Sequence, residues 1–280
     1  MPAAQGRGAD HALPSLGVIA VIVIGFWPSY FAVTTAVPWQ FHAHGVAASL
    51  WVLMVTAQSW TAHSKQQLAL HRAVGKASLL LFPFLTGGLA AIISRQGEDF
   101  VAGDPVNLLY GPGFLIGTMV ALAAYVTVYY RALKYRRKVW VHAGYMLSTP
   151  LILFESPFSR MMGLYIPRFQ VHGPADFPRI METILWSCAI ELLIIALIWW
   201  RVRDRAKPFL VTAGFIVVEM LALAFASDFQ VVKRLDVVIG HTPGGLIWLT
   251  GFAIGAATSW AGWQAGKQPA VPVRAVPLPA

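Results

Sequence analysis

Long apolar runs without charged residues, separated by short polar segments, are the main feature of the chain. The longest extends from Ala12 to Ser64, 53 residues that include no Lys, Arg, Asp or Glu. A membrane-spanning helix takes about 20 apolar residues, so this run predicts two spans with a tight turn between them at AVPWQ. Apolar and polar residues do not alternate as they would in a membrane β-barrel. Because lipid offers the backbone no other hydrogen-bond partner, the pattern predicts an all-α, polytopic transmembrane helix bundle.

Eight apolar runs bounded by charged clusters predict about eight transmembrane helices. They cover residues 14–36, 38–62, 69–94, 108–130, 139–164, 181–201, 207–227 and 244–264. Together they form one helical domain over residues 14–266. A polar N-terminal segment (1–13) precedes this domain, and a proline-rich tail (267–280), expected to be disordered, follows it.

Prolines and glycines within the predicted helices indicate bends and close contacts. Pro28, Pro83 and Pro150 fall inside predicted spans, where a missing N–H favours a bend. The pair Gly87 and Gly88, and the Gly251 to Gly255 spacing in GFAIG, favour close approach of neighbouring helices. We therefore expect the glycines to serve packing.

The composition excludes an ordinary soluble protein. Hydrophobic residues make up 57% of the chain and charged residues only 12%, with a mean hydropathy of +0.62. The net charge is +9, and 15 of the 21 Lys and Arg residues fall on one side of the eight predicted spans. Cytoplasmic loops retain basic residues, so this bias predicts a multi-pass protein of a bacterial inner membrane with both termini in the cytoplasm. The basic residues are spread over several short loops, which argues against nucleic-acid binding.

The second predicted helix carries a polar stripe. Gln40, His44, Trp51 and Gln58 are spaced 4, 7 and 7 residues apart, which places them on one helix face at about 100 degrees per residue. Such a stripe normally faces the inside of a bundle. His42 points to another side, so the HxH pair is weak evidence for a shared metal ion. The alternative is that one or both histidines only form hydrogen bonds at the headgroup level.

Two further histidines open helices on the cytoplasmic side. His71 begins the third predicted helix in LALHRAVGK, and His142 begins the fifth in RRKVWVHAGYM. Both lie within about one turn of the membrane boundary, at the same depth if their helices are neighbours. Two neutral imidazoles facing each other are the usual axial ligands of haem b, with their second nitrogens fixed by other groups. The alternative is two interfacial histidines without a ligand.

Glu155 and Arg160 lie toward the outer end of the fifth predicted helix, in LFESPFSRMM. A Glu and an Arg inside a membrane are costly unless they are paired or hydrated. Arg160 could approach the depth of His42 and His44, so these four residues, here called the outer group, predict an outward-facing pocket with a catalytic role. A structural salt bridge between Glu155 and Arg160 is the alternative.

Two carboxyl groups lie near the middle of the sixth and seventh predicted helices. These residues, Glu191 and Glu219, have no Lys or Arg at the same depth in the sequence pattern, so we expect them to be protonated. Buried carboxyls relay protons or form hydrogen bonds to a neighbouring helix, and both roles stay open. The chain contains no GxSxG, P-loop, dinucleotide-binding or HExxH motif, so the well-marked reaction classes receive no support.

The sequence resembles a widespread group of uncharacterised bacterial polytopic membrane proteins over roughly residues 24–165. The segments that carry the resemblance are GFWPSYF in the first predicted helix, HAHG followed by Trp51 and Gln58 in the second, HRAVG in the third, and VHAGYM followed by SPFSR in the fifth. The resemblance implies a helical membrane bundle.

The same resemblance marks three positions. The group typically shows a histidine in the HRxxG segment, here His71, a second in a basic His-Met segment, here His142, and a downstream arginine, here Arg160. Ala143 and Gly144 replace the basic residues that are common directly after the second histidine. The group is distantly similar to cytochrome b561-type bundles, in which histidines at helix ends hold haem.

Three function classes follow. The first is a haem-binding redox protein that uses His71 and His142, with a histidine of the outer group contributing to a second site and a quinone as small-molecule partner. The second is a membrane enzyme in which the outer group forms a non-haem metal or acid/base site for a lipid-like substrate. The third is a proton-coupled transporter that uses Glu191 and Glu219. Haem b is the expected cofactor, with another metal or none as alternatives, and self-association into a homo-oligomer stays open.

Overall fold

The computed structural model describes residues 17–62 and 65–267. The secondary structure within these residues is helical, without a strand, which confirms the predicted all-α class. The helices are the first helix Gly17–Phe31, α2 (Trp39–Thr61), α3 (Leu68–Val101), α4 (Pro105–Lys134), α5 (Val139–Ile152), α6 (Glu155–Tyr165), α7 (Pro178–Val202), α8 (Lys207–Phe225), α9 (Gln230–His241) and α10 (Gly244–Ala265). Short 3₁₀ turns join several of them.

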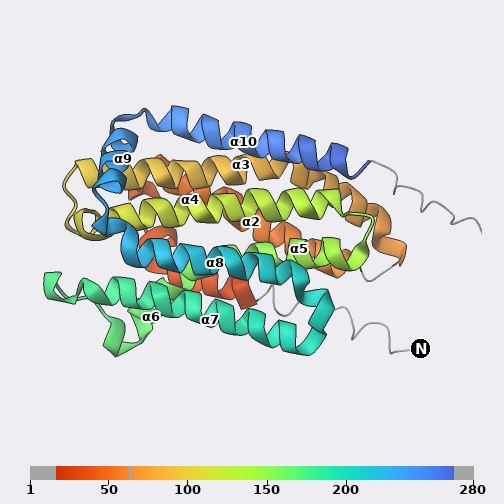
Figure 1. Cartoon of the computed structure of the whole chain (residues 1–280), viewed down its shortest axis with the longest axis horizontal. Coiled ribbons are helices and arrows are strands. Elements are labelled where there is room, and N and C mark those ends of the chain that lie inside the picture. The colour runs from red at the N-terminus through yellow and green to blue at the C-terminus, as the bar shows by residue number, and fades with distance from the viewer. Residues whose placement is uncertain (1–16, 63–64, 268–280) are drawn as a thin grey trace, which may run out of the picture.

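Most helices lie side by side along one long axis, and α9 crosses them at one end (Figure 1). α3 packs against α2 on one side and α10 on another, and α4 contacts α3, α5, α8 and α10. α7 packs between α6 and α8. α8 therefore connects the α6–α7 pair to the rest of the bundle through α4 and α5.

The bundle has two hydrophobic cores. The larger core centres on four side chains that are fully buried, Trp51, Phe82, Tyr125 and Tyr129, from α2, α3 and α4. The rings pack on one another, with Phe82 stacked on Tyr129 at a centroid distance of 4.1 Å. The smaller core lies between α7 and α8 and includes Cys188. Aromatic contacts thus fill the centre of the bundle.

The polar atoms of these core aromatics are satisfied by neighbouring helices. Trp51 Nε1 donates to Thr149 Oγ1 over 2.9 Å, and the Tyr125 hydroxyl donates to the Thr149 carbonyl over 2.7 Å. The Tyr129 and Ser78 hydroxyls share a hydrogen bond of 2.8 Å. Because buried polar groups need partners, these bonds fix α5 relative to α2 and α4.

The glycines lie at close helix crossings, as the sequence predicted. A Cβ atom at Gly88 would lie 2.8 Å from the Ala43 carbonyl oxygen on α2. A Cβ atom at Gly255 would lie 2.1 Å from Thr86 Oγ1, and one at Gly251 would lie 2.4 Å from Ala90 Cβ. α3 therefore approaches both α2 and α10 at distances that only glycine permits.

Three helical stretches are long and apolar enough to cross a membrane. They are α3, α4 and the stretch Pro174–Asp228, which contains α7 and α8. α9 and α10 together form a fourth candidate, bent by 105° between the two helices, and Gly17–Phe31 is a shorter apolar helix. These stretches are consistent with an integral membrane protein.

The predicted single helix 139–164 is wrong, because the structure divides it into α5 and α6. Pro150 has no N–H, so the Met146 carbonyl one turn earlier loses its helical partner. The Thr149 hydroxyl donates to that carbonyl over 2.8 Å instead. The helix ends two residues after the proline, and Glu155 becomes the first residue of α6.

Other predicted boundaries also differ from the structure. The third helix continues through Pro83 and past the predicted end at 94 to Val101, although its last turns are polar. α9 was not predicted, because Lys233, Arg234 and Asp236 interrupt its apolar residues. The 1–13 segment, residues 14–16 of the first predicted span and residues 268–280 of the tail lie outside the described residues.

Candidate functional site

The outer group is partly assembled. Arg160 on α6 lies close enough to both His44 and Glu155 for their charges to interact. The Arg160 guanidinium lies over the Phe26 ring, 4.8 Å from its centroid, and donates to the Ser156 carbonyl over 3.0 Å. Among the ion pairs within the described residues, none joins Glu155 to Arg160. The alternative of a structural salt bridge is therefore not realised.

The two histidines of the outer group have different surroundings. His42 Nδ1 lies 3.0 Å from the Tyr30 hydroxyl at the end of the first helix. His44 Nδ1 is buried and has no hydrogen-bond partner. Arg160 thus lies within electrostatic range of His44 and Glu155, while His42 contacts the first helix. A catalytic role of all four residues stays a prediction.

The buried carboxyls form a cluster that the sequence did not predict. Glu191 on α7 is 1% exposed and Glu219 on α8 is 8% exposed, and Glu155 on α6 lies within electrostatic range of both. Glu191 Oε1 has no hydrogen-bond partner. Cys188 and Tyr125 are also within range of these carboxyls. Glu155 therefore links the outer group to the two carboxyls of the predicted proton relay.

His71 and His142 lie at the same end of the bundle, close enough to interact electrostatically. His142 Nδ1 lies 2.9 Å from the Ala132 carbonyl oxygen. A carbonyl oxygen can only accept a hydrogen bond, so Nδ1 carries the proton and Nε2 is free to act as an acceptor or ligand atom. His71 Nδ1 lies 3.4 Å from Thr61 Oγ1, and Gln58 Nε2 donates to the His71 carbonyl over 2.9 Å. Hence α2 and α4 hold both imidazoles through Nδ1.

A site shared by His71 and His142 needs the third and fifth predicted helices as neighbours, but α3 and α5 do not pack closely against each other. α5 packs against α4 and α8, with a smaller contact to α2, while α3 packs against α2, α4, α9 and α10. α4 follows α3 and precedes α5 in the chain, and it contacts both. The two histidines thus lie at the same end of the bundle on helices that share at most a minor direct contact.

The histidine pair supplies two imidazoles whose Nδ1 atoms have other partners, a donor type that haem takes from proteins. Within residues 17–62 and 65–267, no group of three or more His, Cys, Asp or Glu is arranged to hold a metal ion. Two open, mostly apolar surface grooves, one between α4 and α10 and one on α7, are lined by none of the predicted site residues.

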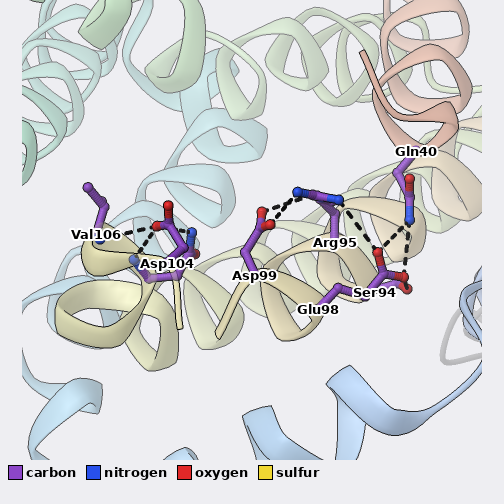
Figure 2. A network of polar contacts seen from close by, with 8 residues as sticks. Gln40, Ser94, Arg95, Glu98, Asp99, Asp104 and Val106 are labelled. Carbon is purple, nitrogen blue, oxygen red and sulfur yellow. Dashed lines mark hydrogen bonds and ion pairs between the residues drawn. The ribbon is translucent and has the colours of Figure 1, made fainter. Parts of the chain in front are cut away.

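A polar network at the other end of the bundle was not predicted (Figure 2). Gln40 Nε2 donates to both Glu98 carboxylate oxygens over 3.1 and 2.9 Å, and Ser94 Oγ donates to Glu98 over 3.0 Å. Arg95 forms an ion pair with Asp99 one turn later. The spacing of Arg95 from Glu98 (i to i+3) and from Asp99 (i to i+4) was a signal in the sequence that α3 continues beyond residue 94.

Asp104 ends this network and caps α4. Its Oδ1 atom accepts hydrogen bonds from the backbone N–H groups of Asn107 (2.9 Å) and Val106 (3.1 Å). The bond from the Asn107 backbone N–H is the main reason that the pKa of Asp104 lies below its ordinary value. An aspartate followed by proline is a typical helix start, so this cap could have been predicted.

No protein-family model, curated protein or solved structure matches the chain. Function must therefore be argued from the arrangement of the site residues alone.

Proposed function

We propose that the chain is an eight-span protein of the bacterial inner membrane, with both termini in the cytoplasm and α5 and α6 together making one span. Three observations support this. Basic residues are concentrated on one side of the predicted spans. The ends of α4 and α10 lie together, since Arg136 Nη1 donates to the Trp263 carbonyl over 2.9 Å. Three or four stretches are already long and apolar enough to cross the bilayer.

Reporter fusions test this topology. Alkaline phosphatase fused after Lys267 should be inactive, and the same enzyme fused between α3 and α4, after Gly103, should be active. An active C-terminal fusion would show that the number of spans is odd or that the orientation is reversed.

Within this topology, we propose that the protein binds haem b and transfers electrons. The observation that carries the proposal is that His71 and His142 lie at the same end of the bundle within electrostatic range, and that Nδ1 of each is held by a neighbouring group.

The chain's own residues would have defined roles at such a site. Bound haem supplies a one-electron redox centre. The Ala132 carbonyl orients His142, and Thr61 orients His71, so that each presents Nε2 as the ligand atom. Gln58 fixes the backbone at His71. The position near the cytoplasmic end favours a small-molecule partner, such as a quinone, that reaches the site from the membrane.

Substitutions at the two histidines test the proposal. The protein is expressed with ample haem, purified in detergent and assayed for haem content by absorption. His71→Ala and His142→Ala should each abolish the low-spin spectrum, and Thr61→Val should weaken haem affinity by about tenfold. His172→Ala, in an exposed loop, is the matched control and should retain full haem content.

Membrane-fraction immunoblots of all variants would establish that the alanine proteins still insert. If the wild-type protein binds haem and both alanine variants retain the spectrum, other residues ligate the iron. If the wild-type protein binds none, the haem function is wrong.

The carboxyl cluster supports a second candidate function, proton transfer or proton-coupled transport. Glu155, Glu191 and Glu219 come from three helices and lie within electrostatic range of one another, without an ion pair among the described residues. Negative charges within electrostatic range repel one another, and Glu191 and Glu219 are also buried, so we expect the cluster to hold protons. Arg160 beside Glu155 marks the outer end of this path.

A hydrophobic carbodiimide tests the second candidate, because it modifies only protonated carboxyls that it can reach from lipid. Mass spectrometry should find Glu155 or Glu219, the two more exposed carboxyls of the cluster, modified, and the modification should disappear in Glu155→Gln and Glu219→Gln, respectively. Glu182, which pairs with Arg168, is the matched control and should stay unmodified. Absence of modification at all three cluster carboxyls would contradict a protonated cluster.

A further inference from the structure

Helix α9 lies against the flank of the bundle. It follows α8 and runs across the other helices before the chain turns by 105° into α10 (Figure 1). A Cβ atom at Gly240 would lie 2.3 Å from the Gly97 carbonyl oxygen, so the α9 and α3 backbones are in direct contact. Gly97 is four residues before the end of α3 at Val101, which corresponds to about 6 Å along the helix.

The contact of α9 with α4 gives a similar depth. A Cβ atom at Gly111 would lie 3.4 Å from Asp236 Oδ2. Gly111 is six residues after the start of α4 at Pro105, or about 9 Å along that helix. α9 therefore packs on the sides of α3 and α4, below their ends.

α9 exposes apolar as well as polar side chains, and the exposed polar ones are Gln230, Arg234 and His241. Its one acidic residue, Asp236, is fully buried, whereas Val231 and Val238 are 71% and 60% exposed. The two valines are seven residues apart and so lie on the same face. Val237 on the adjoining side is also exposed. A helix that turns valines outward at the flank of a membrane bundle matches a lipid neighbour better than water.

The charges on α9 add to this match. Arg234 lies between Val231 and Val238 on the exposed face, and Lys233 is half-buried beside it. Neither cation forms an ion pair with any residue in the described part of the chain. The outer face of α9 thus presents apolar side chains together with unpaired positive charge, which is the composition of helices that bind the boundary between headgroups and acyl chains.

We propose that α9 is a membrane-surface helix whose outer face binds phospholipids of the outer leaflet, with the valines among the upper acyl carbons and Arg234 and Lys233 at anionic headgroup phosphates. The proposal rests on the membrane topology proposed above and is independent of the haem site.

Position-specific fluorescence quenching tests the depth of α9. Cys188→Ala, which removes the buried native thiol, is the background for three labelled variants: Val238→Cys on α9, Leu80→Cys on the lipid-facing middle of α3, and Asp204→Cys in the exposed α7–α8 connection. Each protein is placed, one copy per disc, in nanodiscs of phosphatidylcholine with bromine near the headgroup or near the chain end.

The expected pattern separates the two proposals. The label at residue 238 should be quenched by bromine near the headgroup and protected from aqueous iodide. The label at residue 80 should be quenched by bromine near the chain end. The label at residue 204 should be quenched by iodide alone. If the label at 80 is not quenched by lipid, the membrane topology fails. If the label at 80 behaves as expected and the label at 238 is quenched by iodide, or by neither reagent, α9 faces water or protein and the lipid proposal fails.

Lipid charge provides the second measurement. In discs of equal parts phosphatidylglycerol and phosphatidylcholine, the label at 238 should be quenched more strongly when phosphatidylglycerol carries the bromine. Arg234→Gln and Lys233→Gln should each lower this preference about fivefold, the value that corresponds to ~1 kcal/mol per cation near a membrane surface. The label at Leu80 is the control and should show no preference. An unchanged preference in the double variant would overturn the role of the two cations.

Discussion

The hydrogen bond between Trp51 and Thr149 should be measurable as a coupling between α2 and α5. Trp51 Nε1 donates to Thr149 Oγ1 over 2.9 Å, and both side chains are fully buried. Thr149→Val keeps the shape of the side chain but leaves the indole N–H and the Met146 carbonyl without partners, at a cost of about 1 to 3 kcal/mol. Trp51→Phe removes the donor and also opens space in the aromatic core.

The double variant isolates the bond itself. Interhelical hydrogen bonds in a membrane protein contribute about 0.6 kcal/mol on average and at most ~1.7 kcal/mol in such cycles, so we expect a coupling in this range. Unfolding in mixed micelles can be followed with a thiol-reactive dye, because the single cysteine, Cys188, is buried until the protein unfolds.

Thr250→Val is the matched control for this cycle. The Thr250 hydroxyl is exposed and donates only to the Leu246 carbonyl of its own helix, over 2.9 Å, so its loss should change stability by less than about 0.5 kcal/mol. A coupling of zero, or a Thr149→Val effect as small as that of the control, would refute the contact between α2 and α5.

Two further predictions concern packing and capping. Gly255→Leu should lower the free energy of unfolding by about 1 to 3 kcal/mol, because a Cβ atom at this position would lie 2.1 Å from Thr86 Oγ1. Gly214 has open space around it, so Gly214→Leu is the control and should have little effect in the same unfolding assay. Asp104→Ala should cost about 1 kcal/mol at neutral pH through loss of the α4 cap. Because the pKa of Asp104 is lowered in the folded state, its charge stabilises the protein above its ordinary pKa of about 4, and this contribution disappears as the pH falls through the lowered value. Asp104→Asn should remove that acid dependence, and an unchanged pH profile in this variant would contradict it.

The helical class and the packing glycines could be predicted because both depend on local pattern. Gly251 and Gly255 have the spacing of a close helix contact, and the structure places both against α3. The burial of Glu191 and Glu219 followed from their position in apolar runs. To predict each of these features, it was enough to know the period of a helix and the polarity of the neighbouring residues in the sequence.

Features that depend on tertiary partners could not be predicted. The cluster of Glu155 with Glu191 and Glu219 required knowing that α6, α7 and α8 are neighbours, which no spacing reveals. The hydrogen bonds of Gln40 to Glu98 in the last turns of α3 join residues 58 positions apart in the sequence. α9 was missed because Asp236 breaks its apolar run, although that side chain turns inward in the structure.

The central claim is that His71 and His142 hold haem b, and the most direct test is the visible absorption spectrum of the wild-type protein. The protein, produced with ample haem and purified in detergent, is measured as isolated and after reduction with dithionite. We predict a Soret band that shifts on reduction and the sharp visible bands of a low-spin, bis-histidine haem. A spectrum with no Soret band in either state would contradict the claim.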